Sequence, residues 1–198
     1  MKTYSRFNLL LLFLTLAAVF SGLGVVPYSK GENRGVIAIK NFGKINEHYY
    51  RGGQPAEREF FILRDMGIRT VIDLQKDGPV QARNWAQNAN LKYFNIPLSS
   101  TRPATSQQTE YFLKLVRDSD LWPVYVHCAG GRHRTGAMTA VYRIAQDSWT
   151  ADLAYQEMKK YGYYSFPNHG SLKRFVYQYY DSFMKSKINI HLTPDPNP

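Results

Sequence analysis

Cys128 is the only cysteine in the chain, and the residues after it suit the binding of an anion. The adjacent Gly130 and Gly131 tolerate unusual backbone angles, so successive N–H groups can turn inward and form an anion-binding nest. Arg134 carries a planar guanidinium that can bind two phosphate oxygens at once, and Thr135 can donate its hydroxyl to the sulfur. These residue types at this spacing predict a thiolate nucleophile that faces a bound phosphate group.

The segments on both sides of this loop must place it at the edge of a sheet. Pro123–His127 is a short apolar run that predicts a buried strand, and a helical pattern covers Arg134–Ala145. Such a strand delivers Cys128 to the carboxyl edge of the sheet, where open α/β sheets bind ligands. The helix adds the positive end of its dipole, which favours an anion and an ionised thiol.

Strand and helix patterns alternate through the rest of the chain. Strands are predicted at Arg69–Leu74 and Leu91–Ile96, and Tyr49-Tyr50 predicts the end of an additional edge strand. The remaining helices are predicted at Pro55–Met66, Val80–Ala89, Ser106–Val116, Ala151–Tyr161 and Ser171–Met184. This alternation favours an α/β fold with a mostly parallel central sheet flanked by helices.

A known family shares this pattern of residues. The run His127-Cys128-Ala129-Gly130-Gly131-Arg132-His133-Arg134-Thr135-Gly136 resembles the C-x5-R-T signature of the protein tyrosine and dual-specificity phosphatases. The wider stretch, from Tyr49-Tyr50-Arg51-Gly52-Gly53-Gln54-Pro55 through Thr70–Leu74 to Gly162, is similar to the small atypical dual-specificity branch. The resemblance implies a phosphatase-type three-layer sandwich.

The resemblance also implies a mechanism. Cys128 would attack phosphorus and form a phosphocysteine that water hydrolyses, with no metal or other cofactor. His127 would support the cysteine and the loop through hydrogen bonds. The residues implied to bind the substrate are Ala129, Gly130, Gly131, Arg132, His133 and Arg134.

The sequence departs from the family pattern at the general acid. Most members carry an Asp on the loop after the strand that precedes the nucleophile's strand, and here that loop, Pro97–Gln108, has neither Asp nor Glu. Asp77 lies in a turn sequence after strand Arg69–Leu74 and could project over the site. Glu110 and His133 are the other candidates.

A missing acid would favour leaving groups that need little protonation. Phenolates, with a pKa of about 10, need it less than alkoxides do. A departing phosphate, with a second pKa of about 6, needs it least. The expected substrates are therefore aryl phosphates or phosphoproteins. Inositol polyphosphates or pyrophosphates are the alternative, because His133 before Arg134 is similar to fungal and plant members that act on such compounds.

The formal net charge of +10 favours anionic partners. A phosphorylated protein or a small phosphate compound is expected, whereas nucleic acid is not, because no basic stripe with interleaved aromatic residues occurs. A non-catalytic phosphate-binding module remains an alternative. Arsenate reduction normally needs resolving cysteines, which this chain lacks, and a sulfurtransferase loop would not need Arg134 and Thr135 at this spacing.

The N-terminal segment is expected to be a signal or a membrane anchor. Lys2 and Arg6 precede the apolar run Leu9–Val26, which has no polar face. The positive flank predicts that the folded domain lies outside the cytoplasm, either anchored or exported after cleavage. The predicted organisation is therefore a signal or anchor with linker at 1–34, a phosphatase-like domain at 35–187 and a flexible tail at 188–198.

Overall fold

The computed structural model describes residues 37–167 and 169–192, which belong to a compact unit, Arg34–Pro198. Within these residues, five strands form one sheet in the order β1-β2-β5-β3-β4. β1 runs antiparallel to β2, and every other neighbouring pair is parallel. The strands are β1 (Gly43–Lys44), β2 (Tyr49–Gly52), β3 (Thr70–Gln75), β4 (Lys92–Leu98) and β5 (Val124–His127).

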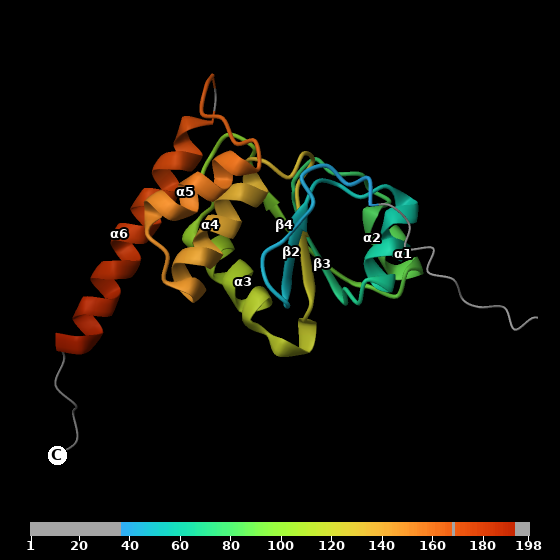
Figure 1. The fold of residues 1–198 in the computed structure, drawn as a ribbon, viewed down its shortest axis with the longest axis horizontal. Coiled ribbons are helices and arrows are strands. Elements are labelled where there is room, and N and C mark those ends of the chain that lie inside the picture. Colours follow the sequence, from blue (N-terminus) through green and yellow to red (C-terminus); the bar gives the residue numbers. More distant parts are fainter. Residues whose placement is uncertain (1–36, 168, 193–198) are drawn as a thin grey trace, which may run out of the picture. The chain divides into compact units, whose positions relative to one another are not determined.

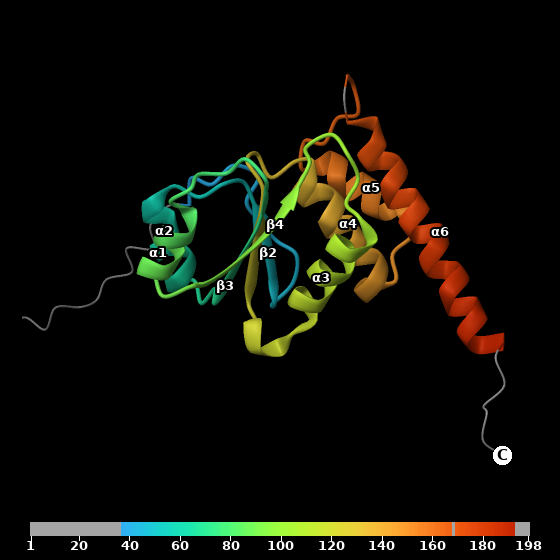
Figure 2. The same ribbon diagram turned by 180° about the vertical axis from the view of Figure 1, so that it is seen from behind.

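Helices cover both faces of the sheet (Figures 1 and 2). One face carries α1 (Glu57–Asp65) and α2 (Ala82–Asn88). The opposite face carries α3 (Ser106–Arg117), α4 (Arg134–Asp147), α5 (Ala151–Lys160) and α6 (Gly170–Leu192). A short 3-10 turn, Ser119–Leu121, leads from α3 towards β5. The expected three-layer α/β sandwich with a mostly parallel sheet is thus confirmed.

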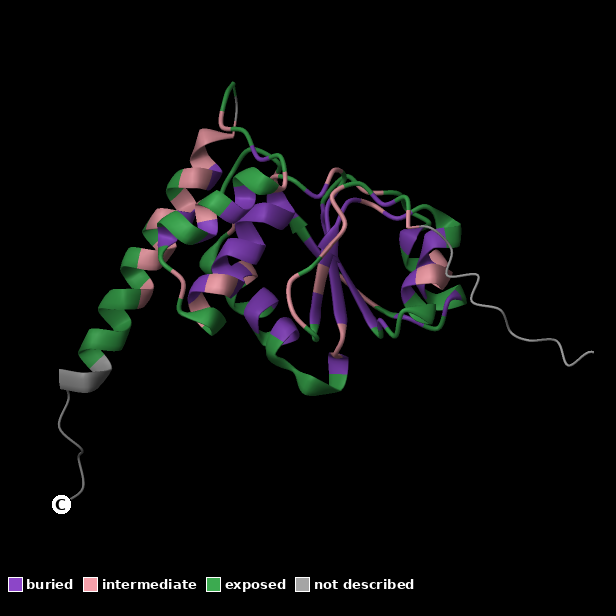
Figure 3. Ribbon diagram, viewed as in Figure 1, coloured by how far each residue is buried: buried purple, intermediate pink, exposed green. Residues whose placement is uncertain are grey.

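The central strands β3 and β5 are buried on both faces of the sheet, which explains why they read as short apolar runs. Every residue of β3 and β5 is buried, as Figure 3 shows for the centre of the molecule. Phe60 packs in the core on the α1 side, and Phe112 packs in the core on the α3 side. Both phenylalanines are fully buried, so truncating either to alanine should cost about 3–5 kcal/mol.

Local signals determine where several helices begin and end. α3 starts with a capping box, in which the Thr105 hydroxyl accepts from the Gln108 N–H and the Gln108 side chain accepts from the Thr105 N–H. Thr150 caps α5 through a single bond, in which its hydroxyl accepts from the Leu153 N–H. α1 ends before Gly67, whose φ of +91° suits glycine.

The structure corrects two details of the predicted elements. Tyr49 and Tyr50 begin β2 rather than end an edge strand, and β2 lies between β1 and β5. The edge strand beside β2 is β1, which has only two residues and therefore leaves no apolar pattern in the sequence. α6 continues to Leu192, beyond the predicted end at Met184.

The predicted signal or anchor segment at residues 9–26 lies outside the described part of the chain. Among the helices of the described part, none is both long and apolar enough to cross a membrane.

Candidate active site

Cys128 follows β5 directly, at the carboxyl edge of the parallel strands. β5 lies between β2 and β3, so the loop after it opens at the centre of this edge. The cysteine side chain is 3% exposed, and α4 begins six residues later at Arg134. A cavity of about 370 Å³ opens here. Its lining residues are Lys40, Ser100, Cys128, Ala129, Gly130, Arg132, His133, Arg134 and Tyr164.

Three consecutive loop carbonyls are held from outside by the segment around β2. The backbone N–H of Gln54 donates to the Ala129 carbonyl over 3.2 Å, and the Asn41 amide donates to the Gly130 carbonyl over 2.7 Å. The guanidinium of Arg51 donates to the carbonyl of the next residue, Gly131. Within the described chain, the N–H groups of residues 129–133 donate to no protein acceptor. These N–H groups are therefore available to an anion, as the predicted nest requires.

Gly131 is required at its position for two reasons. Its φ is +65°, in the left-handed region. A Cβ there would also lie 2.5 Å from the carbonyl carbon of Gly52. At the neighbouring Gly130, a Cβ would meet nothing within 4 Å. The close approach of β2 to the loop thus depends on one of the two glycines.

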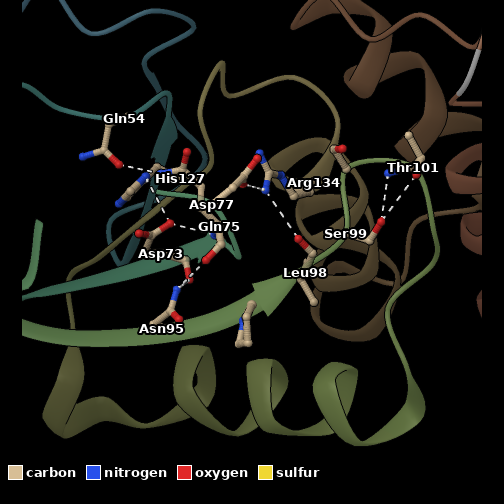
Figure 4. A network of polar contacts seen from close by, with 12 residues as sticks. Gln54, Asp73, Gln75, Asp77, Asn95, Leu98, Ser99, Thr101, His127 and Arg134 are labelled. Carbon is tan, nitrogen blue, oxygen red and sulfur yellow. Dashed lines mark hydrogen bonds and ion pairs between the residues drawn. The ribbon is translucent and has the colours of Figure 1, made fainter. Parts of the chain in front are cut away.

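Arg134 is almost fully buried and makes an ion pair with Asp77 (Figure 4). Its Nη1 lies 2.7 Å from Asp77 Oδ1 and 3.4 Å from the carbonyl oxygen of Leu98. Asp77 lies on the loop after β3, the strand beside β5, which explains how the two residues meet. The hydrogen bond and the charge of Arg134 hold the pKa of Asp77 below its ordinary value.

His127 lies behind the cysteine and is fully buried. Figure 4 shows its ring facing the Asp73 carboxylate, with Nδ1 and Oδ1 3.8 Å apart. Burial lowers the pKa of His127, and the negative charge of Asp73 opposes this. Neither ring nitrogen makes a well-aligned hydrogen bond within the described residues, but the ring has a polar contact with the Cys128 backbone, which also opposes the lowering of the pKa. The ring stacks on Tyr125, with centroids 5.6 Å apart.

His133 belongs to an aromatic cluster that borders the cavity. Its ring stacks on His169 at a centroid distance of 3.7 Å and meets the edge of Tyr164 at 4.5 Å. Burial lowers the pKa of His133 to about 4, and His169 contributes to the decrease. The segment that carries His169 also holds the loop after β4, because His169 Nδ1 lies 2.9 Å from the Ser100 carbonyl oxygen.

The hydroxyl of Thr135 differs from its predicted arrangement. It lies 3.5 Å from the carbonyl oxygen of Gly52 and makes no hydrogen bond to Cys128 Sγ within the described residues. β2 approaches the start of α4 closely, so its carbonyl is the available acceptor. Glu110, another candidate acid, is exposed on α3 and makes no ion pair in the described part of the chain.

Several contributors to the site carry no sequence motif that marks them. Asn41 and Arg51 are about 80 to 90 residues distant in the sequence from the carbonyls that they hold. Tyr164 and Lys40 reach the cavity from segments outside the signature. Asn41 adopts the left-handed backbone, with φ at 52°, which asparagine tolerates better than most residues, so its residue type was the only local hint. In the described residues, no group of three or more metal-ligating side chains occurs.

The fold and the site together define the class of protein. A buried thiol, an anion-binding nest and an arginine six residues after the cysteine meet at the carboxyl edge of a parallel sheet. This is the arrangement of the cysteine-dependent phosphatases, which the sequence resemblance predicted.

The comparisons with known proteins agree with this class. The family model described as "DSP-PTPase phosphatase fused to NAD+ Kinase" matches residues 30–171. The chain therefore belongs to the atypical cysteine-based dual-specificity phosphatase family.

Individual relatives share about a quarter of their residues with this chain. The dual specificity protein phosphatase TpbA of Pseudomonas aeruginosa is 26% identical over 137 residues, which span 69% of this chain and 62% of TpbA. The inositol diphosphatase DSP3 of Arabidopsis thaliana is 27% identical, over 61% of each chain. The catalytic domain of SIW14, a PP-IP phosphatase from S. cerevisiae, has the same fold, with a TM-score of 0.64 and 21% identity over 78% of this chain and 94% of that domain.

Proposed function

We propose that this chain hydrolyses phosphomonoesters, with aryl phosphates such as phosphotyrosine as the preferred class, through a phosphocysteine at Cys128. The observation that carries the proposal is the set of outward-held carbonyls at residues 129–131. The N–H groups of this stretch have no acceptor among the described residues, and the stretch borders the cavity that Cys128 and Arg134 share. In the first step the S–P bond forms as the bond from phosphorus to the leaving oxygen breaks. In the second step water attacks phosphorus and the S–P bond breaks.

Arg134 and Asp77 have linked roles in this proposal. Without substrate, the guanidinium of Arg134 bonds to Asp77. A phosphate group would compete for the same N–H donors, since a bidentate arginine fork matches its oxygens. The Asp77 carboxylate would then be released beside a dianion, which raises the pKa of a carboxyl group. It could thus protonate the leaving oxygen and later accept a proton from water.

Inositol polyphosphates or pyrophosphates are the second candidate substrates. Three cationic residues, Lys40, Arg132 and Arg134, line the cavity, and no carboxylate does so among the described residues. This lining suits a substrate with several phosphate groups. Cleavage of a phosphoanhydride also makes little demand on an acid, because the leaving phosphate is weakly basic. The relatives DSP3 and SIW14 carry such substrates in their names.

The test compares the full chain with Cys128→Ser and Asp77→Asn on a phosphotyrosine peptide, a phenyl phosphate series and an inositol pyrophosphate. Cys128→Ser should abolish turnover of every substrate. Asp77→Asn should slow hydrolysis by about 10²-fold or more when the leaving phenol is weakly acidic, and much less when it is strongly acidic. An equal loss across the series would contradict the assignment of Asp77 as the acid.

The binding-module alternative makes a different prediction from either enzyme. Inorganic phosphate would bind, but none of the three substrates would be turned over. Preference for the pyrophosphate over the aryl ester would instead support the second candidate.

We also propose that residues 9–26 anchor the chain in a membrane or direct its export, with the domain outside the cytoplasm. The proposal is supported by the apolar run Leu9–Val26 and by Lys2 and Arg6 before it. Fractionation of cells that express the full chain tests it. An anchored chain should resist a salt wash and dissolve in detergent, and an exported one should begin after Gly22 or Gly24. An intact chain in the cytosol would contradict both.

A further inference from the structure

Arg51 on β2 is fully buried, yet no acidic side chain neutralises it. Within the described residues, no carboxylate oxygen lies within 4.0 Å of its guanidinium. Its Nε and Nη1 also lack hydrogen-bond partners there. Arginine keeps its proton in proteins, so this position holds a buried positive charge without an anionic partner. Such a charge is costly to bury, and its retention calls for a reason.

The contacts of Arg51 point to the anion-binding loop. Its Nη2 donates to the Gly131 carbonyl, and its guanidinium carbon lies 3.9 Å from the centroid of the Tyr161 ring. The cation–π contact offsets part of the cost of burial. Burial lowers the pKa of Arg51, whereas Tyr49 and Tyr161, followed by Glu157 and Cys128, oppose this change. Arg51 does not line the cavity, so its charge acts from behind the loop.

Holding the loop in shape does not explain the charge. The two preceding carbonyls, of Ala129 and Gly130, are held by neutral donors, the Gln54 N–H and the Asn41 amide. A neutral side chain could hold the Gly131 carbonyl in the same manner. Glu157 also acts on Arg51, but only from beyond ion-pair distance, and its carboxylate is paired with Arg143. The anions left to balance Arg51 are those of the site itself, the thiolate and a phosphate in the loop.

We propose that Arg51 is a positioning residue whose buried charge stabilises the thiolate of Cys128 and the phosphate bound in the loop, without contacting either. The inference rests on the proposed function, because it assigns Arg51 a part in the same site. It adds a cation outside the C-x5-R signature to the site.

The test uses the full chain and two variants that separate charge from hydrogen bonding. Arg51→Gln retains a donor for the Gly131 carbonyl but loses the charge, and Arg51→Lys retains the charge. Cys128 is the only cysteine, so its rate of alkylation by iodoacetamide reports the thiolate directly. Inorganic phosphate affinity, from protection against alkylation, is the second measurement.

Loss of the positive charge of Arg51 should change both the pH dependence of alkylation and the affinity for inorganic phosphate. For Arg51→Gln, loss of a charge should move the midpoint of alkylation against pH upward by about one unit and weaken phosphate affinity about tenfold. Arg51→Lys should stay within about threefold of the wild type. The control is Arg64→Met on α1, which removes an arginine that pairs with Asp65 and lies over the ring of Phe61. It should leave both alkylation and phosphate affinity unchanged.

Two results would overturn the inference. One is an Arg51→Gln chain whose alkylation by iodoacetamide and phosphate affinity equal those of the wild type. Arg51 would then have a structural role only. The other needs no variant to fold: wild-type alkylation that inorganic phosphate does not slow, because the buried charge would then have no anion in the loop to stabilise. Neither measurement depends on turnover. If no substrate were hydrolysed while Arg51→Gln still shifted both, the proposed activity would fail and the role of Arg51 would stand.

Discussion

The stacked imidazoles of His133 and His169 make stability depend on pH in a defined direction. The folded-state pKa of His133 is lowered to about 4, from an ordinary value of 6.5, first by burial and then by His169. The unfolded chain therefore binds a proton at His133 between these values, and the folded chain does not. Acidification from pH 7 to pH 5 should then lower the free energy of unfolding by about 2 kcal/mol through this residue alone.

Urea unfolding of the full chain at pH 7 and pH 5, in buffers without phosphate, measures this loss. His133→Asn should remove about 2 kcal/mol of it. The matched control is His48→Asn, which removes an imidazole stacked on Trp122 and should keep the wild-type loss. If His133→Asn lost as much stability on acidification as the wild type, the reasoning would be wrong. The same low pKa is why a neutral His133 is a poor proton donor at pH 7.

Four further substitutions test the loop and its border. Gly131→Ala should cost more than about 2 kcal/mol of unfolding free energy through the clash with Gly52, whereas Gly130→Ala should cost under about 1 kcal/mol; equal losses would contradict the geometry. Asn41→Gly keeps the left-handed backbone but removes the bond to the loop, so it should cost about 1 kcal/mol and raise KM several-fold, and an unchanged KM would argue against that role. Tyr164→Ala should raise KM for an aryl phosphate several-fold and keep kcat within about twofold. An unchanged KM would show that the ring takes no part in binding.

The sequence predicted most of the fold because the decisive patterns are local. The apolar runs of β3, β4 and β5 are bounded by turn residues, and the signature lies between a strand and a helix. β1 escaped prediction because two residues, one of them glycine, carry no strand pattern. The interior position of β2 depends on pairing with both β1 and β5, which is information that only the folded sheet contains.

At the site, too, features set by local sequence were predictable, whereas contacts set by the folded sheet were not. Cys128 and Arg134 were predictable, since their spacing and context are local. The ion pair between Arg134 and Asp77 arises because β3 and β5 are adjacent in the sheet, although the two residues are 57 apart in the sequence. Thr135 was expected to bond to the sulfur, but its hydroxyl donates to the carbonyl of Gly52. The acceptor was set by how closely β2 packs on α4.

The hydrogen bonds that hold the loop carbonyls from outside have a consequence for the order of folding. Asn41 and Gly130 are 89 residues apart, and Arg51 and Gly131 are 80 apart. Long-range contacts of this kind form late, because the intervening chain must lose its freedom before they can close. During synthesis, the residues that shape the nest emerge well before the loop that they hold. A chain whose β2 has not yet docked beside β5 would have its cysteine but no anion pocket, so enzymatic activity should appear only with the last stage of folding.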